Sequence, residues 1–311
     1  MQKKTITVSV PVFNEQENIR PAYERIKNVM ESLTAYNYEI VFFDDGSTDG
    51  SRAEIEALCE ADPLVRAVFY TRNFGYAKTV FYCMQQARGD AAVIVHCDLQ
   101  NPPEEIPRFI ERWEQGADVV LGVKNKSREN RFVFLLRTFC YWLANVRFGM
   151  RLVYHSTEFE LLDQSIIAVL RQVRTSEPFL RGLVLEYGRH IEKVYYTQDK
   201  RAAGTSHFNL VKYYEFAVGA MVYSGRCLPR RLLAFSLIGL TATVLEFFIG
   251  FLPGAAGMPR AQVGNGVILR FCLFVLLLLL LSLSLLFEFI VALRRDQAQK
   301  PIIVEEKRLN F

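Results

Sequence analysis

The first 125 residues alternate between two hydrophobic periodicities, and this alternation constrains the fold more than any other feature of the chain. Apolar runs typical of β-strands occupy residues 5–13, 38–45, 65–72, 91–98 and 117–124. Amphipathic helix spacing occupies residues 15–33, 49–59 and 76–88, and Pro102 and Pro103 open a further helix. This order predicts an α/β fold, in which a mostly parallel sheet carries helices on both faces.

Two long apolar stretches lie near the C-terminus. Residues 232–252 contain Glu246 as their only charge, and residues 271–293 contain only Glu288. A helix needs about 20 apolar residues to cross a bilayer. Arginines and lysines precede the first stretch and follow the second, whereas residues 253–267 between them carry only Arg260 as a basic residue. The positive-inside rule therefore predicts a transmembrane hairpin with both chain ends in the cytoplasm. The lone acids within the spans are compatible with a homo-oligomer.

The expected organisation has four parts. Residues 1–207 would form a cytosolic catalytic domain and residues 208–231 a juxtamembrane amphipathic helix with a linker. Residues 232–293 would form the hairpin, and residues 294–311 a cytosolic tail. Residues 131–150 and 208–224 are rich in aromatic residues with flanking Arg or Lys, which is typical of helices lying in the membrane interface. For 131–150 an ordinary core helix explains the pattern equally well.

The charge balance excludes some classes of partner. The chain has 37 basic and 33 acidic residues, a net charge of +4, so the composition does not favour nucleic-acid binding. A local excess occurs in residues 119–151, with seven basic residues against one acidic residue. It indicates either an anionic partner, such as a phosphate or a lipid head group, or a solvated face. Six scattered cysteines without a Cys-x-x-Cys pair indicate neither a disulfide framework nor a zinc site.

Four polar segments follow predicted strands: residues 11–15 (PVFNE), 44–49 (DDGSTD), 72–75 (RNFG) and 98–104 (DLQNPPE). The carboxyl ends of parallel strands meet at one edge of a sheet, where ligands bind. An acid pair before Gly-Ser-Thr is compatible with a simple turn and helix cap, but the four segments together indicate a nucleotide-sugar site. Asp98 and Gln100 offer a carboxylate and an amide oxygen for Mg²⁺ or Mn²⁺. Such an ion would neutralise a departing diphosphate.

These segments, with residues 179–182 (FLRG) and 201–207 (RAAGTSH), resemble family 2 glycosyltransferases of the GT-A fold. The similar branch transfers a sugar from a nucleotide-sugar to polyprenyl phosphate, and the resemblance covers residues 5–240. It implies inverting transfer, with a UDP-sugar as the expected donor and undecaprenyl phosphate as the acceptor. It further implies a place in the bacterial cytoplasmic membrane and a role in cell-surface glycan assembly or modification.

The resemblance also implies roles for individual residues. The nucleoside pocket would be lined by Pro11, Phe13, Glu15, Phe42 and Asp44. The diphosphate and metal motif would comprise His96, Cys97, Asp98 and Gln100, with Lys124 near a phosphate. The acceptor phosphate would contact Arg128, Arg131, Arg201, Ser206 and His207. The candidate catalytic residues are Asp98, Glu158 and Arg201.

Four positions depart from the pattern of the family. His96 replaces an acid of the metal motif, and Glu158 is one methylene longer than the usual Asp. Glu160 replaces a usual Arg, and His207 replaces a Lys. Three of these lie in the acceptor half, and two alternatives remain open. One is a hydroxyl acceptor, with Glu158 as general base. The other is a catalytically weakened membrane subunit that binds nucleotide-sugar.

Overall fold

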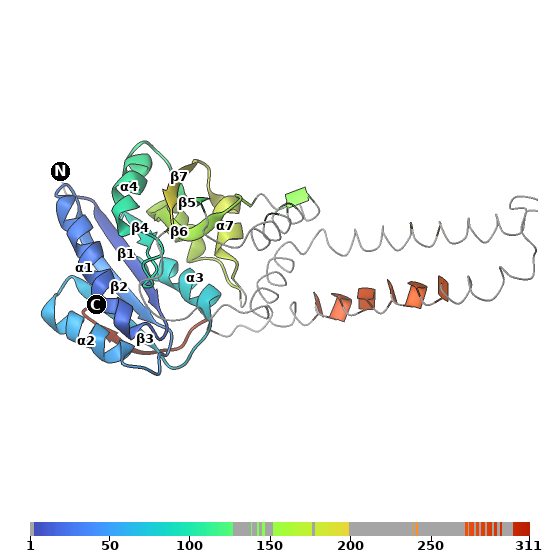
Figure 1. Ribbon diagram of the computed structural model, residues 1–311, viewed down its shortest axis with the longest axis horizontal. Coiled ribbons are helices and arrows are strands. Elements are labelled where there is room, and N and C mark those ends of the chain that lie inside the picture. Colours follow the sequence, from blue (N-terminus) through green and yellow to red (C-terminus); the bar gives the residue numbers. More distant parts are fainter. Residues whose placement is uncertain are drawn as a thin grey trace, which may run out of the picture. The chain divides into compact units, whose positions relative to one another are not determined.

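The computed structural model describes residues 3–126, 152–175, 178–198 and 301–311, four residues between 138 and 146, residues 238 and 241, and most of 271–293 (Figure 1). The described residues up to 198 and those from 301 onward belong to one compact unit, which contains the candidate site. Those between 238 and 293 belong to a second unit.

The first unit alternates strands and helices as the periodicities predict. Its elements in chain order are β1 (Thr5–Val12), α1 (Gln16–Ser32), β2 (Asn37–Asp44), α2 (Ser51–Ala61), β3 (Val65–Tyr70), α3 (Tyr76–Gln86), β4 (Ala91–Ile94), η1 (Pro103–Glu105), α4 (Ile106–Glu114), β5 (Val119–Lys126), β6 (Ser156–Asp163), α6 (Gln164–Leu170), α7 (Leu180–Tyr187), β7 (Ile191–Thr197) and β8 (Glu305–Leu309).

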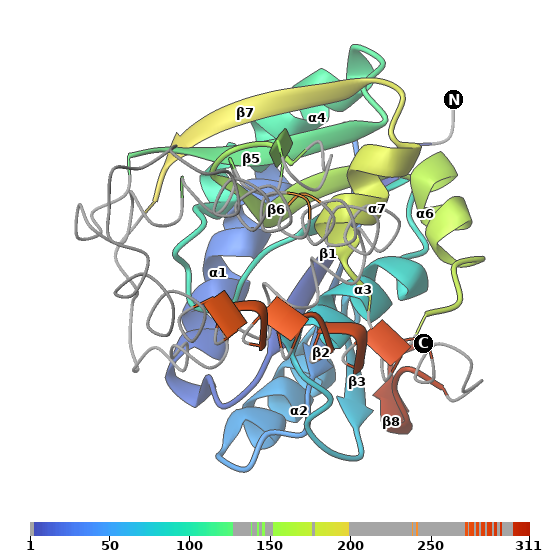
Figure 2. The same cartoon turned by 90° about the vertical axis from the view of Figure 1, so that its right-hand side faces the viewer.

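The strands form one eight-stranded sheet in the order β7-β5-β6-β4-β1-β2-β3-β8. Figure 2 shows β7 and β5 at one edge and β3 with β8 at the other. The pairs β1–β2, β1–β4, β2–β3 and β5–β7 are parallel, and β6 and β8 pair with their neighbours in the antiparallel sense. The predicted α/β class is therefore confirmed, but the sheet is mixed, because β6 and β8 make three antiparallel pairs beside the four parallel ones.

Both faces of the sheet are buried, which explains why its strands are continuously apolar. Ile40 and Phe42 of β2 pack in the core cluster that includes residues of α1, α2 and α4. The alternate residues Val41 and Phe43 pack in a second cluster with Cys83 of α3. Since side chains alternate between the two faces of a strand, helices cover both faces. Figure 1 shows α1 and α2 on one side of the sheet and α3 on the other.

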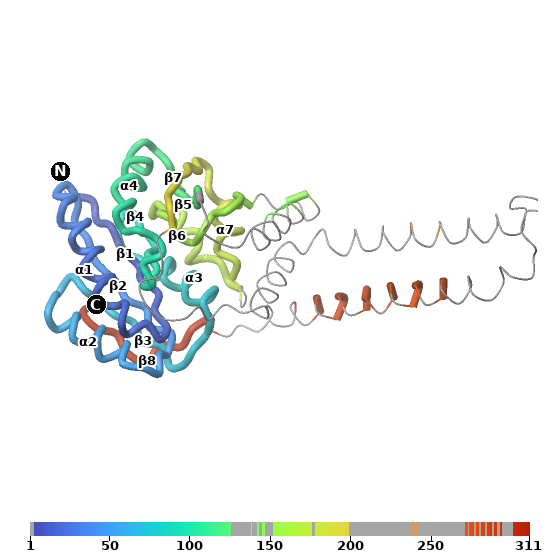
Figure 3. The backbone as a smooth tube through the Cα atoms, viewed as in Figure 1, coloured from blue at the N-terminus to red at the C-terminus, as the bar shows by residue number. Residues whose placement is uncertain are grey.

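The end of the chain differs from the expected organisation. The prediction treated residues 294–311 as a tail outside the catalytic domain, whereas residues 305–309 form β8, antiparallel to β3 (Figure 3). The sequence Glu-Glu-Lys-Arg-Leu has no apolar alternation, because β8 is an edge strand with mostly exposed charged side chains. Local periodicity therefore could not reveal it.

The predicted membrane segments lie largely outside the described residues. Residues 208–231 are not described, and of 131–150 and 232–252 only a few positions are. The described residues of 271–293 are helical. Within the described part of the chain, no helix is long and apolar enough to cross a membrane.

Candidate functional site

The loops that follow β1 and β2 are joined by hydrogen bonds at the carboxyl edge of the sheet. The backbone N–H of Asn14 donates to Oγ of Ser47 at 2.9 Å, and the N–H of Thr48 donates to Oδ1 of Asn14 at 2.8 Å. The N–H of Glu15 donates to Oγ of Ser51 at 3.0 Å. Asn14 has φ 54°, a left-handed conformation that Asn tolerates better than most residues. The predicted segments 11–15 and 44–49 thus meet in space.

The acid pair at the end of β2 is almost completely buried. Asp44 is 2% exposed, and its Oδ1 accepts a hydrogen bond from the Ser47 N–H at 3.2 Å. The two oxygens of Asp45 accept from the N–H groups of Phe74 at 2.7 Å and Gly75 at 3.0 Å. Burial raises the pKa of both carboxyl groups above the usual value, although their hydrogen bonds act in the opposite direction.

The third segment, 72–75, packs directly against the second. Gly46 has φ 66°, and a Cβ atom there would lie 2.5 Å from the carbonyl carbon of Arg72. Only glycine therefore fits between the two loops. Together with the hydrogen bonds from Phe74 and Gly75 to Asp45, this contact fixes segment 72–75 against the end of β2.

The five residues predicted for the nucleoside pocket differ in exposure. Pro11, Phe13 and Glu15 are partly exposed at the end of β1. Asp44 is buried at the end of β2, and the ring of Phe42 is fully buried within the core. The structure thus brings four of them to the carboxyl edge and places Phe42 in the packing beneath it.

Asp98 and Gln100 lie in the turn after β4. Oδ1 of Asp98 accepts from the Gln100 N–H at 3.1 Å, and Oε1 of Gln100 accepts from Nε2 of Gln198 at 2.8 Å. Within the described residues, no group of three His, Cys, Asp or Glu side chains could hold a metal ion. The residues still fit Mg²⁺, because this ion is commonly bound by one or two carboxylates while substrate phosphates and waters complete the shell.

His96 is fixed by its neighbours through both ring nitrogens. Nε2 is hydrogen-bonded to the hydroxyl of Tyr76 at 2.6 Å, and Nδ1 is hydrogen-bonded to the side-chain amide nitrogen of Asn101. Burial lowers the pKa of His96, although the carboxylates of Asp98 and Glu158 act in the opposite direction. In this arrangement neither nitrogen is available to a metal ion. His96 therefore acts as a structural part of the motif. The neighbouring Cys97 is buried in the core.

Glu158 lies beside His96 because β6 runs antiparallel to β4, with Leu161 opposite Val93. Its Oε2 accepts hydrogen bonds from the Arg181 guanidinium at 2.5 Å and from the Tyr76 hydroxyl at 3.3 Å. Burial by itself raises the pKa of Glu158, but the charge and the hydrogen bond of Arg181 outweigh it and the pKa is lowered. Glu158 is therefore a buried carboxylate at neutral pH.

Comparison with known proteins assigns this arrangement to a family. The sequence model described as glycosyl transferase family 2 matches residues 7–174, more than half of the chain. The chain belongs to glycosyltransferase family 2.

Two relatives specify the branch of family 2. Bactoprenol glucosyl transferase of Shigella phage SfX is 33% identical over 246 residues, which cover 79% of each chain. Undecaprenyl-phosphate 4-deoxy-4-formamido-L-arabinose transferase of Pseudomonas paraeruginosa is 28% identical over 306 residues, covering 95% of this chain and 88% of that protein. The predicted resemblance to the polyprenyl-phosphate branch is therefore confirmed.

The fold also matches a solved glycosyltransferase. Glucosyl-3-phosphoglycerate synthase from Mycobacterium tuberculosis, in complex with Mn²⁺, UDP-glucose and phosphoglyceric acid, superposes with a TM-score of 0.52. The match covers 71% of this chain and 80% of that chain at 19% identity. At this identity the likeness shows a shared fold, and it agrees with the predicted GT-A architecture.

Glu160 shows what a departure from the family pattern does in this glycosyltransferase. It follows Glu158 by two residues and so points to the same face of β6. Its side chain is fully buried, and neither carboxylate oxygen has a hydrogen-bond partner among the described residues. Burial, with the nearby charge of Glu158, raises the pKa of Glu160 to about 8, although Arg181 acts in the opposite direction. The acid that replaces the usual Arg of the family therefore adds little negative charge at pH 7.

Sequence reasoning missed several residues of this glycosyltransferase site. Arg181 lies in the FLRG segment, which was used for the resemblance without assigning a role to this residue. Tyr76 directly follows the segment 72–75, a position that could have drawn attention to it. Asn101 is buried and accepts a 2.6 Å hydrogen bond from the Tyr196 hydroxyl, so a strand distant in sequence supports the His96 turn.

The remaining predicted residues are placed only in part. Lys124 lies on β5 and is partly exposed. The other predicted phosphate contacts lie outside the described residues: Arg128, Arg131, Arg201, Ser206 and His207. Arg201 is also one of the three candidate catalytic residues.

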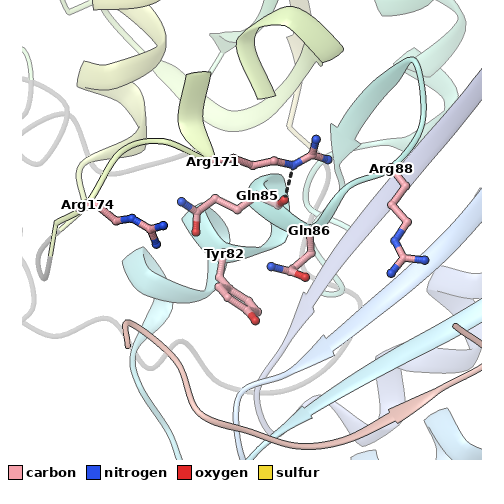
Figure 4. A pocket seen from close by; sticks show the side chains of 6 residues that line it. All are labelled: Tyr82, Gln85, Gln86, Arg88, Arg171 and Arg174. Carbon is pink, nitrogen blue, oxygen red and sulfur yellow. Dashed lines mark hydrogen bonds between the residues drawn. The ribbon is translucent and has the colours of Figure 1, made fainter. Parts of the chain in front are cut away.

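A surface depression of about 560 Å³ lies outside the predicted site. Its lining residues are Tyr82, Gln85, Gln86, Arg88, Arg171 and Arg174 (Figure 4). Nε of Arg171 donates to the carbonyl oxygen of Gln85 at 2.9 Å, so this guanidinium binds the last turn of α3. None of the residues predicted for donor or acceptor lines this depression.

Proposed function

We propose that this glycosyltransferase transfers a sugar from a nucleotide-sugar to polyprenyl phosphate, with inversion at the anomeric carbon. The expected donor is a UDP-sugar and the expected acceptor undecaprenyl phosphate. One observation carries the proposal: the Tyr76 hydroxyl contacts both His96 of the donor motif and Glu158. The candidate catalytic carboxylate therefore lies beside the motif expected to bind the diphosphate. The relatives named for bactoprenol and undecaprenyl phosphate support this acceptor.

The donor half is built from loops that hold one another in place. Asp44 and Glu15 lie at adjacent strand ends and can accept hydrogen bonds from a nucleoside. Asp98 is partly exposed and presents a carboxylate at the next strand end. A bound Mg²⁺ or Mn²⁺ would neutralise charge on the departing nucleoside diphosphate. Because these loops are preorganised, little conformational entropy is lost when the donor binds.

The pKa of Glu158 favours a phosphate acceptor over a hydroxyl acceptor. A general base works best when its pKa lies near the working pH, whereas Arg181 holds the pKa of Glu158 below its usual value. The second pKa of a phosphate monoester is about 6, so the acceptor is already an anion at neutral pH. One of its oxygens would form the new bond to the anomeric carbon as the bond to the diphosphate breaks, and no base is required.

In this mechanism Glu158 and Arg181 position the acceptor. The Arg181 guanidinium lies at the candidate acceptor side and offers positive charge that is already fixed in direction. Lys124 and the arginines at 128, 131 and 201 are the further cations proposed to contact phosphate. Positioning an anion next to the anomeric carbon lowers the barrier mainly by removing rotational and translational freedom.

The two predicted spans would place this chemistry at the cytoplasmic face of a bacterial inner membrane, with both termini in the cytoplasm. A polyprenyl phosphate has its phosphate at the head-group level, where a membrane-anchored domain can reach it. The product would be a lipid-linked sugar for cell-surface glycan assembly or modification. The partners of the protein are then the donor, the lipid and the membrane.

The proposal is tested with the purified full-length protein in lipid nanodiscs. Labelled UDP- and GDP-sugars are offered singly with undecaprenyl phosphate and with Mg²⁺ or Mn²⁺. We expect one donor to give an acid-labile sugar–phosphate lipid with inverted anomeric configuration, identified by mass spectrometry and NMR. A stable glycoside would support the hydroxyl-acceptor alternative. Donor binding without a product would support the weakened-subunit alternative.

A further inference from the structure

The chain returns to the catalytic domain after the second predicted span and completes its sheet. Glu305 of β8 lies opposite Tyr70 of β3, and Leu309 lies opposite Ala67. Without β8, strand β3 would be an exposed edge with unpaired backbone groups. Because β8 is antiparallel, its first residue lies at the carboxyl end of β3, where the donor loops are.

The far end of this strand is firmly attached. Nδ2 of Asn310 donates to the carbonyl oxygens of Cys59 at 2.7 Å and Val65 at 2.8 Å. The ring of Phe311 lies 5.6 Å from the Arg66 guanidinium, a cation–π distance. These contacts bind the last residues of the chain to the α2–β3 connection, away from the donor loops.

The near end contacts the start of the donor loop 72–75. Both the N–H and the hydroxyl of Thr71 donate to the carbonyl oxygen of Val304, at 3.1 and 3.2 Å. The Tyr82 hydroxyl donates to Oε1 of Glu305 at 2.5 Å. Residues 304 and 305 are therefore bonded both to the residue that precedes the loop and to the helix that follows it.

The same segment supplies the packing beneath the loop. Ile303 is buried in the cluster that contains Phe43, Tyr70 and Cys83, with Phe74 packed against it. The Tyr70 ring contacts the Phe74 ring edge-on at 6.2 Å between centroids. Truncation of Ile303 would therefore remove apolar contacts from the cluster that supports Phe74.

Phe74 links this packing to the donor site. Its backbone N–H and that of Gly75 bind the two oxygens of Asp45. A shift of Phe74 would therefore move the carboxyl group that connects segment 72–75 to the end of β2. The path from Ile303 to Asp45 thus runs through one packed apolar cluster and two backbone hydrogen bonds.

We infer that residues 302–305 are a positioning element of the donor site, which sets donor affinity through the loop 72–75. The inference rests on the proposed function, because it assumes that the donor binds at these loops. Ile303 and Glu305 are positioning residues, since Ile303 lies in the cluster against which Phe74 packs and Glu305 accepts the hydrogen bond of Tyr82 on α3. A chain segment that follows the predicted membrane spans thereby takes part in donor binding.

The decisive experiment measures donor KM and kcat for the full-length Ile303→Ala protein. Removing the side chain loosens the support of Phe74, so we expect donor KM to rise roughly five- to tenfold while kcat at saturating donor changes little. The conservative Ile303→Val protein should recover most of the affinity. The matched control is Ile110→Ala, which makes the same truncation at a buried isoleucine elsewhere, on α4. It should leave donor KM near the wild-type value.

Two milder variants keep the test informative if Ile303→Ala does not fold. Tyr82→Phe removes only the hydrogen bond to Glu305 and should raise donor KM about threefold. Lys307→Ala, also on β8, removes an exposed ion pair with Glu56 of α2 and should leave donor KM unchanged. Unchanged donor KM in the Ile303 and Tyr82 variants would overturn this inference alone. A wild-type protein that binds no nucleotide would overturn both this inference and the proposed function.

Discussion

The guanidinium of Arg181 donates a 2.5 Å hydrogen bond to the carboxylate of Glu158, across 23 positions of sequence. Both side chains are largely buried, at 18% and 11% exposure, so solvent screens the pair weakly. The pair keeps Glu158 ionised in a place where burial alone would favour its neutral form. The charges of both partners also act on Glu160: Glu158 raises its pKa, and Arg181 acts in the opposite direction.

Replacement of Arg181 tests this relationship. Arg181→Ala leaves Glu158 buried without its counter-charge, and breaking a buried pair costs about 3–5 kcal/mol. We expect a lower melting temperature, together with a pH–rate profile displaced to higher pH as the pKa of Glu158 rises. Thermal unfolding and kcat against pH measure the two effects. Arg181→Lys keeps the charge and should recover part of both. An unchanged pH profile in Arg181→Ala would contradict the assignment.

Glu160 makes the stability of the protein depend on pH. Its pKa is about 8 when folded and near 4.5 in an unfolded chain. Above pH 4.5 the unfolded chain releases a proton that the folded protein keeps, so the free energy of unfolding falls as pH rises from 4.5 to 8. Glu160→Gln removes this loss, which amounts to at most about 5 kcal/mol above pH 8. Melting temperatures at pH 5 and pH 8 should diverge for the wild type and converge for the variant.

The control for Glu160 is an exposed acid on a helix of the same domain. Glu60→Gln, on the surface of α2, should leave the difference in melting temperature between pH 5 and pH 8 as in the wild type. If Glu160→Gln behaves in the same way, Glu160 does not carry the raised pKa.

The first half of the fold was predictable because its signals are local. Strands at 5–13 and 38–45 and the helices after them follow from periodicity, and the observed β1 and β2 end within one residue of those bounds. Their polar ends were predicted to meet, since parallel strands share a carboxyl edge. The contacts of Asn14 with Ser47 and Thr48 agree with that expectation.

The acceptor side was less predictable because its contacts join residues distant in sequence. Tyr76 reaches Glu158 across 82 positions, and no local pattern encodes the antiparallel placement of β6 beside β4. The charge of Glu160 depends on its complete burial, which a residue type does not reveal. For β8 the charged sequence concealed a strand, since an edge strand needs no apolar alternation.

Asp98 is the proposed metal-binding carboxylate, and its replacement should separate donor chemistry from folding. Asp98→Asn keeps an acceptor for the Gln100 N–H and should leave the free energy of unfolding within about 1 kcal/mol of the wild-type value. We expect kcat to fall by at least about a hundredfold, because charge on the departing diphosphate is no longer balanced. Turnover measured against Mn²⁺ concentration checks this. Full activity of Asp98→Ala in a metal-dependent assay would refute the assignment.

Tyr76 connects the donor motif to the acceptor side, so removal of its hydroxyl should uncouple them. Tyr76→Phe keeps the ring against His96 but deletes the hydrogen bonds to His96 and Glu158. The lost hydrogen bonds to the buried histidine and carboxylate should lower stability by roughly 1–3 kcal/mol and kcat by roughly tenfold. Donor KM should change less than kcat, because the loops after β1 and β2 do not contact this hydroxyl and only His96 of the donor motif does. Tyr154→Phe, on an exposed tyrosine outside the proposed site, serves as the control and should leave kcat unchanged. Equal kcat in Tyr76→Phe and the wild type would show that the hydroxyl does not position Glu158 for the reaction.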